Sequence, residues 1–590
     1  IYDRNGVILA DNRPVFTAVI SPDEIDNLDN TLALLTPIFQ LTPEEISEAS
    51  KALKKSKNEP VTIKIGLTEQ QVAQFSERKP FFKGVTIQSK LTRTYPYSDL
   101  FAHVIGYVGR ISDNDSKKLD KKLYAGTDLI GKTGIEKYYE SLLLGKPGYQ
   151  SIETNAYGDI IKKLDTKPPI PGNDIYLSLD YGLQKLTSDL LNGKRGAAVA
   201  IDPNTGEILA FVSNPSFDPN PFITGISSRE YKALQQDPDM PLYNRALQGQ
   251  YPPGSSIKPI EGLAGIHYGI MGWDSSIYDP GYFSLPGDSH KFRDWKKSGH
   301  GNVNLHKSVV ESVDTYYYKL SYQLGIDRLH DWMTRFNFGS KTGIDLPGEK
   351  TGVYPSTEWK MKTYKKAWLP GETISVSIGQ GYFLATPLQI ANGIAMLAGD
   401  GQHLTPHLLK KSTGAEHITP IEKPDGKIQY NGNPNDWQRM HLAMEDVVKK
   451  GTAHNIYTPT YRIAGKTGTA QVKSIAQGKR YNEAALDSRH WDHGWFVGFA
   501  PVENPQIAIA VIVENGRHGG WVAPIVRKMM DYWLIDKIKN PIVPPSPEEL
   551  VKINAEKQAA KLQREALVLS GKPIIAKPNT AKLPAVGGAD

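Results

Sequence analysis

The amino-acid sequence predicts an α+β protein with more than one domain, because strand-like segments occur both before and after a long run of helical segments. Short apolar, strand-like segments occur at 174–179, 197–201 and 208–212, and others occur much later, at 495–500 and 507–513. Long amphipathic stretches with helical spacing fill the interval between the two groups. We therefore expect one α+β domain whose sheet joins early and late segments of the chain.

Proline and glycine punctuate the chain and divide it into three parts. A Lys-Pro-Pro-Ile-Pro-Gly cluster at 167–172 ends a first unit, residues 1–172, and a second unit covers 173–540. The first unit opens with a hairpin signal, Asn5-Gly6, and Thr42 and Gly134 begin predicted helices. Beyond this, residues 541–590 contain several prolines, one helix-like run and a Pro/Lys/Gly stretch, so we expect a largely disordered tail.

The composition narrows the class of protein. The chain of 590 residues is 39% hydrophobic and 22% charged, which is typical of a globular protein and not of a disordered one. Its net charge of +6 is mild and no dense Lys/Arg block occurs, so we expect no nucleic-acid partner. The chain has no cysteine, which excludes disulfides and thiolate nucleophiles. No apolar run is long enough to span a membrane, and we expect that an anchor was removed ahead of Ile1.

The main chemical signal is the sequence Tyr-Pro-Pro-Gly-Ser-Ser-Ile-Lys at 251–258. Pro-Pro-Gly predicts a turn from which a helix begins, so that Ser255 and Lys258 lie one turn apart on the same face. The positive end of the helix dipole favours an alkoxide-like serine and disfavours a protonated lysine. This arrangement activates a serine nucleophile without histidine. A similar pattern at 76–79, which begins at Ser76, lies in a charged helix and is interpreted as a solvated surface.

Two further motifs make Ser255 more specific. Ser312-Val313-Asp314 follows it, and Lys-Thr-Gly occurs at four places in the chain. Only the copy at Lys466 follows an apolar, strand-like lead and precedes the strand pair that begins at 495. An edge strand beside the nucleophile aligns an extended peptide and supplies an N–H group for an oxyanion. A loop at 517–520 is expected near the same sheet and is assigned no role.

These motifs, in this order, resemble those of penicillin-binding proteins and class A β-lactamases. The resemblance to class B penicillin-binding proteins covers nearly the whole chain. The elongation subgroup also shares the segments at 3–6, 93–96, 293–297, 299–301 and 378–382, and Asp314 where most relatives have Asn. The resemblance implies an N-terminal pedestal with hinged sub-lobes, followed by a penicillin-binding (transpeptidase) domain with an antiparallel sheet flanked by helices, as in serine β-lactamases.

The resemblance also implies roles for the motif residues. Ser255 attacks the penultimate D-Ala carbonyl of a peptidoglycan stem peptide, and Lys258 accepts its proton. Ser312 relays a proton to the leaving amine, Asp314 positions Lys258, and Lys466 supplies positive charge. The substrate-binding strand consists of Thr467, Gly468 and Thr469, and the N–H groups of Ser255 and Thr469 form the oxyanion hole. A β-lactam mimics the D-Ala-D-Ala end and forms an ester with Ser255 that resolves slowly.

A metal site is a weaker expectation. Asp279, Asp294 and His300 precede the second motif, and two carboxylates with an imidazole are ligands that Zn²⁺ accepts. The elongation subgroup has a Cys as fourth ligand where this chain has Val313, which cannot coordinate. No cofactor is required for the chemistry, and zinc binding stays open against a purely structural pairing of these residues.

Other functions stay open at this point. A D,D-carboxypeptidase or a β-lactamase uses the same motifs, and a β-lactam-binding sensor or scaffold needs only acylation or the first unit. The resemblance further implies a place on the periplasmic side of the bacterial inner membrane. It also implies that the pedestal contacts a RodA-type glycan polymerase and the scaffold protein MreC.

Overall fold

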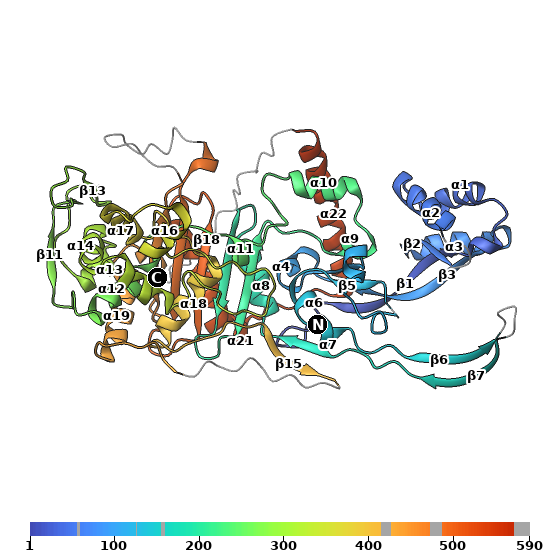
Figure 1. Ribbon diagram of the computed structural model, residues 1–590, viewed down its shortest axis with the longest axis horizontal. Coiled ribbons are helices and arrows are strands. Elements are labelled where there is room, and N and C mark those ends of the chain that lie inside the picture. The colour runs from blue at the N-terminus through green and yellow to red at the C-terminus, as the bar shows by residue number, and fades with distance from the viewer. Residues whose placement is uncertain (56–59, 126, 155–159, 415–425, 473–486, 572–590) are drawn as a thin grey trace.

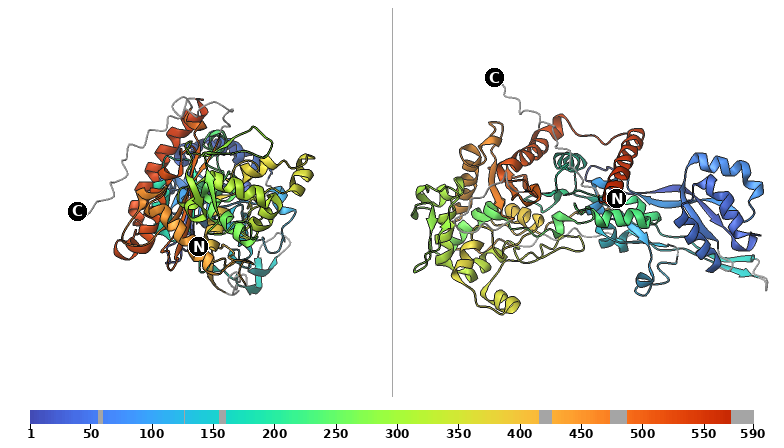
Figure 2. Two further views of the ribbon diagram at one scale, coloured as in Figure 1. Left: turned by 90° about the vertical axis from the view of Figure 1, so that its left-hand side faces the viewer. Right: turned by 90° about the horizontal axis from the view of Figure 1, so that it is seen from above.

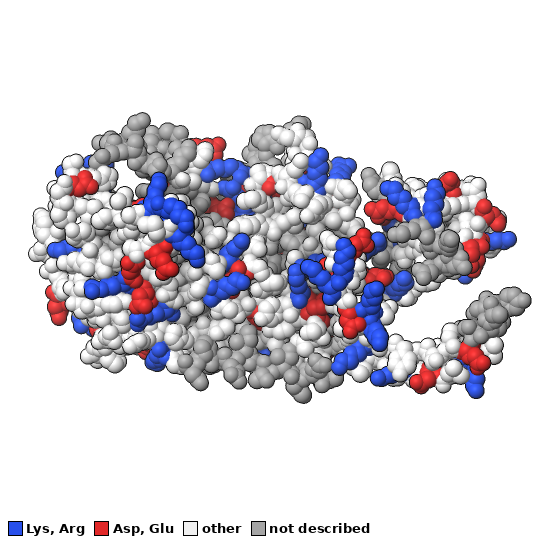
Figure 3. Space-filling view, viewed as in Figure 1, with Lys and Arg blue, Asp and Glu red and all other residues white. Residues whose placement is uncertain are grey.

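The computed structural model describes residues 1–55, 60–125, 127–154, 160–414, 426–472 and 487–571. The molecule is elongated, with the second unit at one end and a small lobe of the first unit at the other (Figures 1 and 2). Lys and Arg side chains are interspersed with Asp and Glu over the face shown in Figure 3. Among the described residues, no helix combines the length and apolar character that crossing a membrane requires.

A five-stranded antiparallel sheet forms the centre of the second unit. Its strands are β9 (Gly196–Ile201), β10 (Ile208–Asn214), β16 (Ala464–Ala470), β17 (His493–Ala500) and β18 (Ile507–Val513), in the order β10-β9-β18-β17-β16. The early strand β9 pairs with the late strand β18, with Val199 opposite Ala510. The expected α+β fold, with a sheet that joins early and late segments, is thus confirmed, and β16 is an edge strand.

Helices enclose this sheet, and α18 and α20 pack directly on it. Almost every residue of the five strands is buried, as expected where both faces are covered. Eleven α-helices of the described chain follow β10 and precede β16. They are α9 (Asn220–Thr224), α10 (Ser228–Gln236), α11 (Arg245–Gln248), α12 (Lys258–His267), α13 (Leu305–Val310), α14 (Asp314–Leu324), α15 (Ile326–Thr334), α16 (Thr357–Tyr364), α17 (Pro370–Val376), α18 (Pro387–Ala398) and α19 (Asn435–Lys449). Helix α20 (Gly519–Asp531) follows β18, and α8 (Tyr181–Leu190) packs on β10.

The lobe at the far end has a hydrophobic core of its own. It consists of β1 (Asp11–Ile20), β2 (Val61–Leu67), β3 (Val85–Thr94), α1 (Leu28–Phe39), α2 (Pro43–Lys55) and α3 (Glu69–Arg78), with strand order β2-β1-β3. Leu35, Phe39 and Phe75 are buried in a cluster that is separate from the core of the second unit. The helix predicted at Thr42 is confirmed, because the Glu45 N–H donates to the Thr42 hydroxyl.

Smaller elements connect this lobe to the second unit. They are α4 (Ala102–Ile105), β4 (Val108–Arg110), α5 (Asp113–Ser116), β5 (Leu129–Gly131), α6 (Gly134–Tyr138) and α7 (Glu140–Leu143). The helix predicted at Gly134 is therefore present. A long hairpin of β6 (Tyr149–Thr154) and β7 (Ile160–Lys167) extends toward the far lobe (Figure 1).

The first ten residues pack on the second unit and not on the far lobe. The Tyr2 N–H donates to the Ile175 carbonyl in β8 (Asp174–Leu177), and Arg4 pairs with Glu207 at 2.9 Å. The predicted hairpin forms here, because the Asp3 N–H donates to the Val7 carbonyl. Residues 1–172 and 173–540 thus follow one another along the chain, while the largest core takes residues from both.

The prediction of a largely disordered tail is wrong for residues 547–569. These residues form α22 (Pro547–Leu569), which begins with a capping box between Ser546 and Glu549. The helix lies beside α10 (Ser228–Gln236), as Figure 1 shows. The helix-like run of the sequence is thus α22, and its docking was not foreseen because it depends on charge, with Lys557 on Asp99 and Arg564 on Asp237 and Asp239. Residues 572–590 of the expected tail lie outside the described residues.

We predict that Arg564→Ala releases α22. Arg564 makes contacts of 2.5 Å with Asp237 and 2.7 Å with Asp239, and partly exposed pairs of this kind contribute on the order of 1 kcal/mol. Hydrogen exchange of the α22 amides should become faster in the variant, and about 1 M salt should have the same effect on the unchanged chain. Lys552→Ala, an exposed position on the same helix, is the control. Unchanged exchange in the Arg564 variant would contradict this docking mode.

Candidate active site

Ser255 lies on a short 3₁₀ turn, η4 (Gly254–Ile257), which leads directly into α12. The turn lies against the edge strand, because a Cβ atom added to Gly254 would meet the Thr469 carbonyl oxygen at 2.3 Å. Gly254 also has a φ of +56°, so glycine is required here on two grounds. The sequence predicted the turn and the helix, and the structure adds one 3₁₀ turn between them.

A buried ion pair anchors the turn from behind. The Tyr251 hydroxyl donates to Glu514 at 2.7 Å, and the fully buried Arg245 donates to the same oxygen at 2.8 Å. Glu514 follows β18, so the pair ties the segment before Ser255 to the central sheet. No motif identified Arg245 or Glu514, since each is a single charged residue in the sequence.

Lys258 extends from α12 toward the second motif. Its fully buried ammonium donates to Asp314 Oδ1 at 2.6 Å and to the Ser312 carbonyl at 2.9 Å, and Ser312 Oγ lies at 3.5 Å. It also lies 5.2 Å from the centre of the Tyr317 ring, where the π-system favours a cation. Helices α12 and α14 thus place the lysine of the first motif on both polar residues of the second.

Ser312 and Lys466 complete the group. Ser312 has a φ of +56°, in the turn between α13 and α14, and its hydroxyl accepts a hydrogen bond from Lys466 Nζ at 2.7 Å. Burial lowers the pKa of Lys466 well below its ordinary value, and the positive charge of Lys258 lowers it further. The structure therefore brings together Ser255, Lys258, Ser312, Asp314 and Lys466, as the sequence predicted.

The edge strand presents polar groups to the same place. Gln380 donates to the Thr469 carbonyl at 3.0 Å, and both backbone groups of one strand residue point to the same side. The Thr469 N–H therefore points away from β17 and toward the open side of β16. The Thr467 hydroxyl is 2.8 Å from that of Thr452. At Gly468 a Cβ atom would come within 2.9 Å of the Pro253 carbonyl oxygen, so this position also requires close backbone approach.

A cleft of about 390 Å³ opens over these groups. Besides the motif residues Ser255, Ser312, Asp314, Thr467 and Thr469, it is lined by Trp295, Ile378, Gln380, Thr452, Gln471, Asp492, His518, Gly519 and Gly520. The loop at 517–520, which had no assigned role, therefore borders the cleft. Thr452 and Gln471 were missed because nothing in their local sequence marks them. Within the described part of the chain, the Ser255 hydroxyl makes no hydrogen bond.

The alternative motif copies lie elsewhere. Ser76 is exposed on α3, and its hydroxyl donates to the Val72 carbonyl of the same helix. Lys132 pairs with Asp115 in the first unit. The Thr342 hydroxyl of a third copy donates to Glu349 at 2.6 Å, and Lys350 of the fourth lies in the same turn region. None of these residues lines the cleft, and Ser76 is exposed as the sequence predicted.

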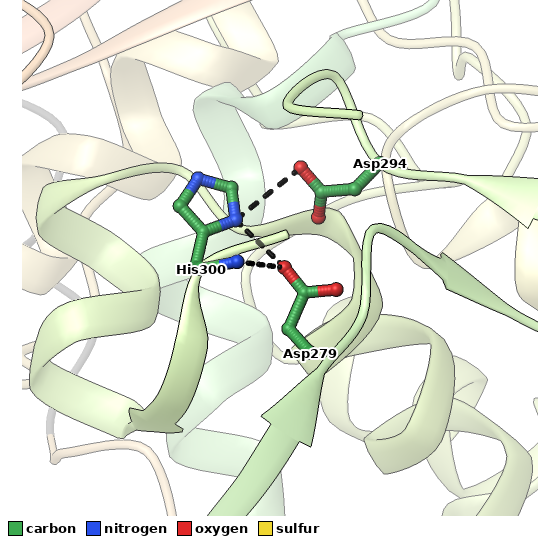
Figure 4. Close-up of side chains that lie close together, drawn as sticks. All are labelled: Asp279, Asp294 and His300. Atoms are coloured by element: carbon green, nitrogen blue, oxygen red, sulfur yellow. Dashed lines mark hydrogen bonds and ion pairs between the residues drawn. The ribbon is translucent and has the colours of Figure 1, made fainter. Parts of the chain in front are cut away.

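The three expected metal ligands lie together beside α14 (Figure 4). His300 Nδ1 is 2.7 Å from Asp279 Oδ2 and 3.6 Å from Asp294 Oδ1. Asp294 Oδ2 accepts from the N–H groups of Asp314 and Thr315 at 2.7 and 3.0 Å, and so caps α14. The cap comes from another segment because Val313, at the N-cap position, has no side-chain acceptor.

The pKa values of the two carboxylates in this cluster are shifted in opposite directions. Burial alone would raise the pKa of Asp279, but hydrogen bonds from His300 and from the Gly281 N–H lower it. Burial raises the pKa of Asp294, and the nearby charge of Asp314 raises it further. Hydrogen bonds join His300 to Asp279, and the Asp294 cap on α14 connects the cluster to Asp314, the residue that pairs with Lys258.

An antiparallel sheet whose edge strand faces a Ser-x-x-Lys helix defines a serine acyl-transfer enzyme. Comparison with known proteins agrees: the penicillin binding protein transpeptidase domain matches residues 196–531, and the penicillin-binding protein dimerisation domain matches residues 1–177. The chain belongs to the class B penicillin-binding proteins of the penicillin-binding protein 2 (MrdA) group, which are peptidoglycan D,D-transpeptidases.

Three relatives document this membership. The chain is 59% identical over 545 residues to the peptidoglycan D,D-transpeptidase MrdA of Acinetobacter baumannii, covering 92% of this chain and 81% of the relative. A crystal structure of Pseudomonas aeruginosa PBP2 in complex with WCK 5153 is 46% identical, with a TM-score of 0.68, and the match covers 76% of this chain and 92% of that one. A chain in a solved complex between PBP2 and MreC from Helicobacter pylori is 32% identical to this chain, with a TM-score of 0.79. The match covers 90% of this chain and 97% of that one.

We predict that Lys466→Met stabilises the fold while it slows acylation by penicillin. Lys466 is fully buried and has no carboxylate partner among the described residues, and a neutral side chain of similar length avoids the cost of burying its charge. The melting temperature at pH 7 should rise, whereas it should not rise in Lys319→Met, an exposed position on α14.

The pH dependence gives a second test of the same variant. Because the pKa of Lys466 is lower in the folded chain than in the unfolded chain, the unfolded chain binds more protons between the two values. The free energy of unfolding of the unchanged protein therefore rises with pH in that window. The advantage of methionine should shrink as the pH approaches the ordinary lysine value of 10.5. A melting temperature that falls in the variant at pH 7 would contradict the assignment.

Proposed function

We propose that this transpeptidase forms its acyl-enzyme at Ser255 and that the residues around the cleft act as a unit. The single observation that carries the proposal is the convergence of three separate parts of the chain: Ser255 and Ser312 line one cleft, and Lys258 and Lys466 both reach Ser312 Oγ. The substrate is the D-Ala-D-Ala end of a stem peptide, which lies extended along β16.

In the first step, the Lys258 ammonium has already released one proton, so that its neutral Nζ can act as the base. Ser255 Oγ then bonds to the carbonyl carbon of the penultimate D-Ala and passes its proton to Lys258 Nζ. The oxyanion forms between the N–H groups of Ser255 and Thr469, and the outward direction of the Thr469 N–H supports this placement. The bond to the terminal D-Ala then breaks, and Ser312 Oγ, 3.5 Å from Lys258 Nζ, relays the proton to the leaving amine.

Lys466 and the two threonines recognise the terminal carboxylate of the donor. Lys466 Nζ holds Ser312 Oγ at 2.7 Å, which orients the relay hydroxyl, and places positive charge at the same end of the cleft. Thr467 and Thr469 supply hydroxyl donors along the strand. Asp314 holds Lys258 at 2.6 Å. The amine of a second stem peptide then attacks the ester carbonyl, loses a proton, and Ser255 regains its own.

We also propose that the first unit docks with an MreC-type scaffold and a RodA-type polymerase on the periplasmic side of the inner membrane. The support for the scaffold is the Helicobacter pylori relative, solved in complex with MreC. Exposed apolar side chains in the first unit, such as Phe81 at 83% and Leu91 at 73%, add to it.

Zinc fits part of the cluster beside α14. Asp279, Asp294 and His300 offer ligand atoms within 4.8 Å of one another, but Val313 is buried and offers none. We therefore propose weak binding through three ligands, in which the ion would add a structural link between these segments. No step of the acyl transfer depends on it.

We predict that Ser255→Ala abolishes the covalent adduct with labelled penicillin, because among the described residues no other hydroxyl that lines the cleft has a lysine one helical turn later. Intact-mass analysis after incubation measures the adduct directly. Ser76→Ala, the matched change in the other Ser-x-x-Lys copy, should leave it unchanged. An adduct that persists on the Ser255 variant would sink the assignment.

We predict weak zinc binding that depends on His300. Elemental analysis of the purified chain after incubation with Zn²⁺ should find metal that His300→Ala loses, and Val313→Cys should bind it more tightly because a thiolate completes the tetrahedron. If neither the unchanged chain nor the cysteine variant retains metal, the cluster is structural only.

A further inference from the structure

A basic surface lies along one side of the cleft and has no role in the chemistry described above. We call it the basic rim and define it by two exposed segments. One is Lys296 and Lys297, directly after the cleft residue Trp295, and the other is Lys362, Tyr364, Lys365 and Lys366 at the end of α16.

Each segment of the basic rim connects to the cleft by its own route. A Cβ atom added to Gly371, at the start of α17, would lie 3.5 Å from the ring of Phe292. Helix α17 therefore packs near Phe292, three residues before Trp295. The end of α16 reaches the cleft through Tyr364, whose ring lies 5.4 Å from that of Tyr382, two residues after Gln380. From α17 the chain continues to Ile378 and Gln380, which line the cleft together with Trp295. The rim is thus an extension of the cleft wall.

The lysines of the rim are accessible to an external anion. Within the described residues, no ion pair involves Lys296, Lys297, Lys362, Lys365 or Lys366, and all five are exposed. By contrast, Lys360 in the same helix is buried and pairs with Glu372. Glu358 is the one exposed acid of α16, so positive charge prevails along the segment.

Apolar side chains are exposed among these charges. Trp295 is 60% exposed, Tyr364 48% and Leu369 61%. Tyr364 lies 5.4 Å from the ring of Tyr382, and Trp359 adjoins both, so the aromatic rings form a supported surface. Exposed apolar side chains in one place mark a binding surface, and flat rings with polar surroundings suit a ligand that is both polar and ring-shaped.

The reaction needs such a surface. Cross-linking joins two strands, and the cleft holds the end of one donor peptide along β16. The acceptor amine must enter where the leaving D-Ala departs, on the Ser312 side, and Trp295 lines the cleft there. An acceptor strand carries sugar rings and free carboxylates, which match exposed aromatic rings and unpaired lysines.

We propose that the basic rim binds the acceptor glycan–peptide strand and guides its amine to the acyl-enzyme. The inference rests on the proposed function, because it assigns the second substrate of that reaction. It makes Lys362, Lys365 and Lys366 specificity-determining residues outside the acylation chemistry.

The test separates strand binding from acylation. In the full chain with Ser255→Ala, the triple substitution Lys362→Gln, Lys365→Gln and Lys366→Gln should weaken co-sedimentation with purified peptidoglycan about tenfold at low salt. Added salt should weaken binding of the chain that keeps the three lysines more than that of the triple variant. With Ser255 intact, the same triple variant should still react with labelled penicillin at the normal rate, since this ligand fills only the cleft.

A matched control removes the same charge elsewhere. Lys117→Gln, Lys118→Gln and Lys121→Gln lie exposed in the first unit, and this control should keep its peptidoglycan binding. Equal loss in both variants, no loss in the rim variant, or a rim-dependent preference for anionic lipid vesicles over peptidoglycan would each overturn the proposal. Failure of the proposed function would appear separately, as no penicillin adduct on the unsubstituted chain.

Discussion

The pairing of β9 with β18 is the constraint on which the rest of the structure depends. It joins the hairpin that precedes Ser255 to the hairpin that follows Lys466, with Val199 opposite Ala510. The helices between them are then enclosed in one domain, and the edge strand β16 lies beside the turn at Gly254. If this pairing were lost, the nucleophile and its strand would have no common frame.

The site places the amines of two lysines in the protein interior, where burial disfavours their charged forms. Lys258 and Lys466 are both fully buried, and one carboxylate, Asp314, faces Lys258 at 2.6 Å. Burying a charge without a full partner costs stability, so the central sheet and its helices must offset it. The Asp294 cap on α14 supports this arrangement, because it fixes the end of the helix that carries Asp314, the partner of Lys258. The buried lysines thus lower the stability of the fold, while they place amines close to the nucleophile Ser255.

The first unit and the C-terminal helix meet the second unit through different physics. Residues 1–10 pack apolar side chains into the main core, whereas α22 is held by ion pairs that salt weakens. The far lobe has a hydrophobic core of its own, which is separate from the core of the second unit. A pedestal built in this way suits the proposed docking of partners on the first unit, away from the cleft.

The sequence by itself determined the fold class, the strand pairs and the five motif residues that the structure brings together, because periodicity, turns and short motifs are local properties of the chain. It also identified Asp279, Asp294 and His300, which do lie together. What it did not reveal are contacts between distant single residues: Glu514 beneath Tyr251, Thr452 beside Thr467, and Arg564 on Asp237. Only the tertiary structure decided these, because a lone charge or hydroxyl has no periodic signal, and its partner is chosen by the packing of the sheet and helices.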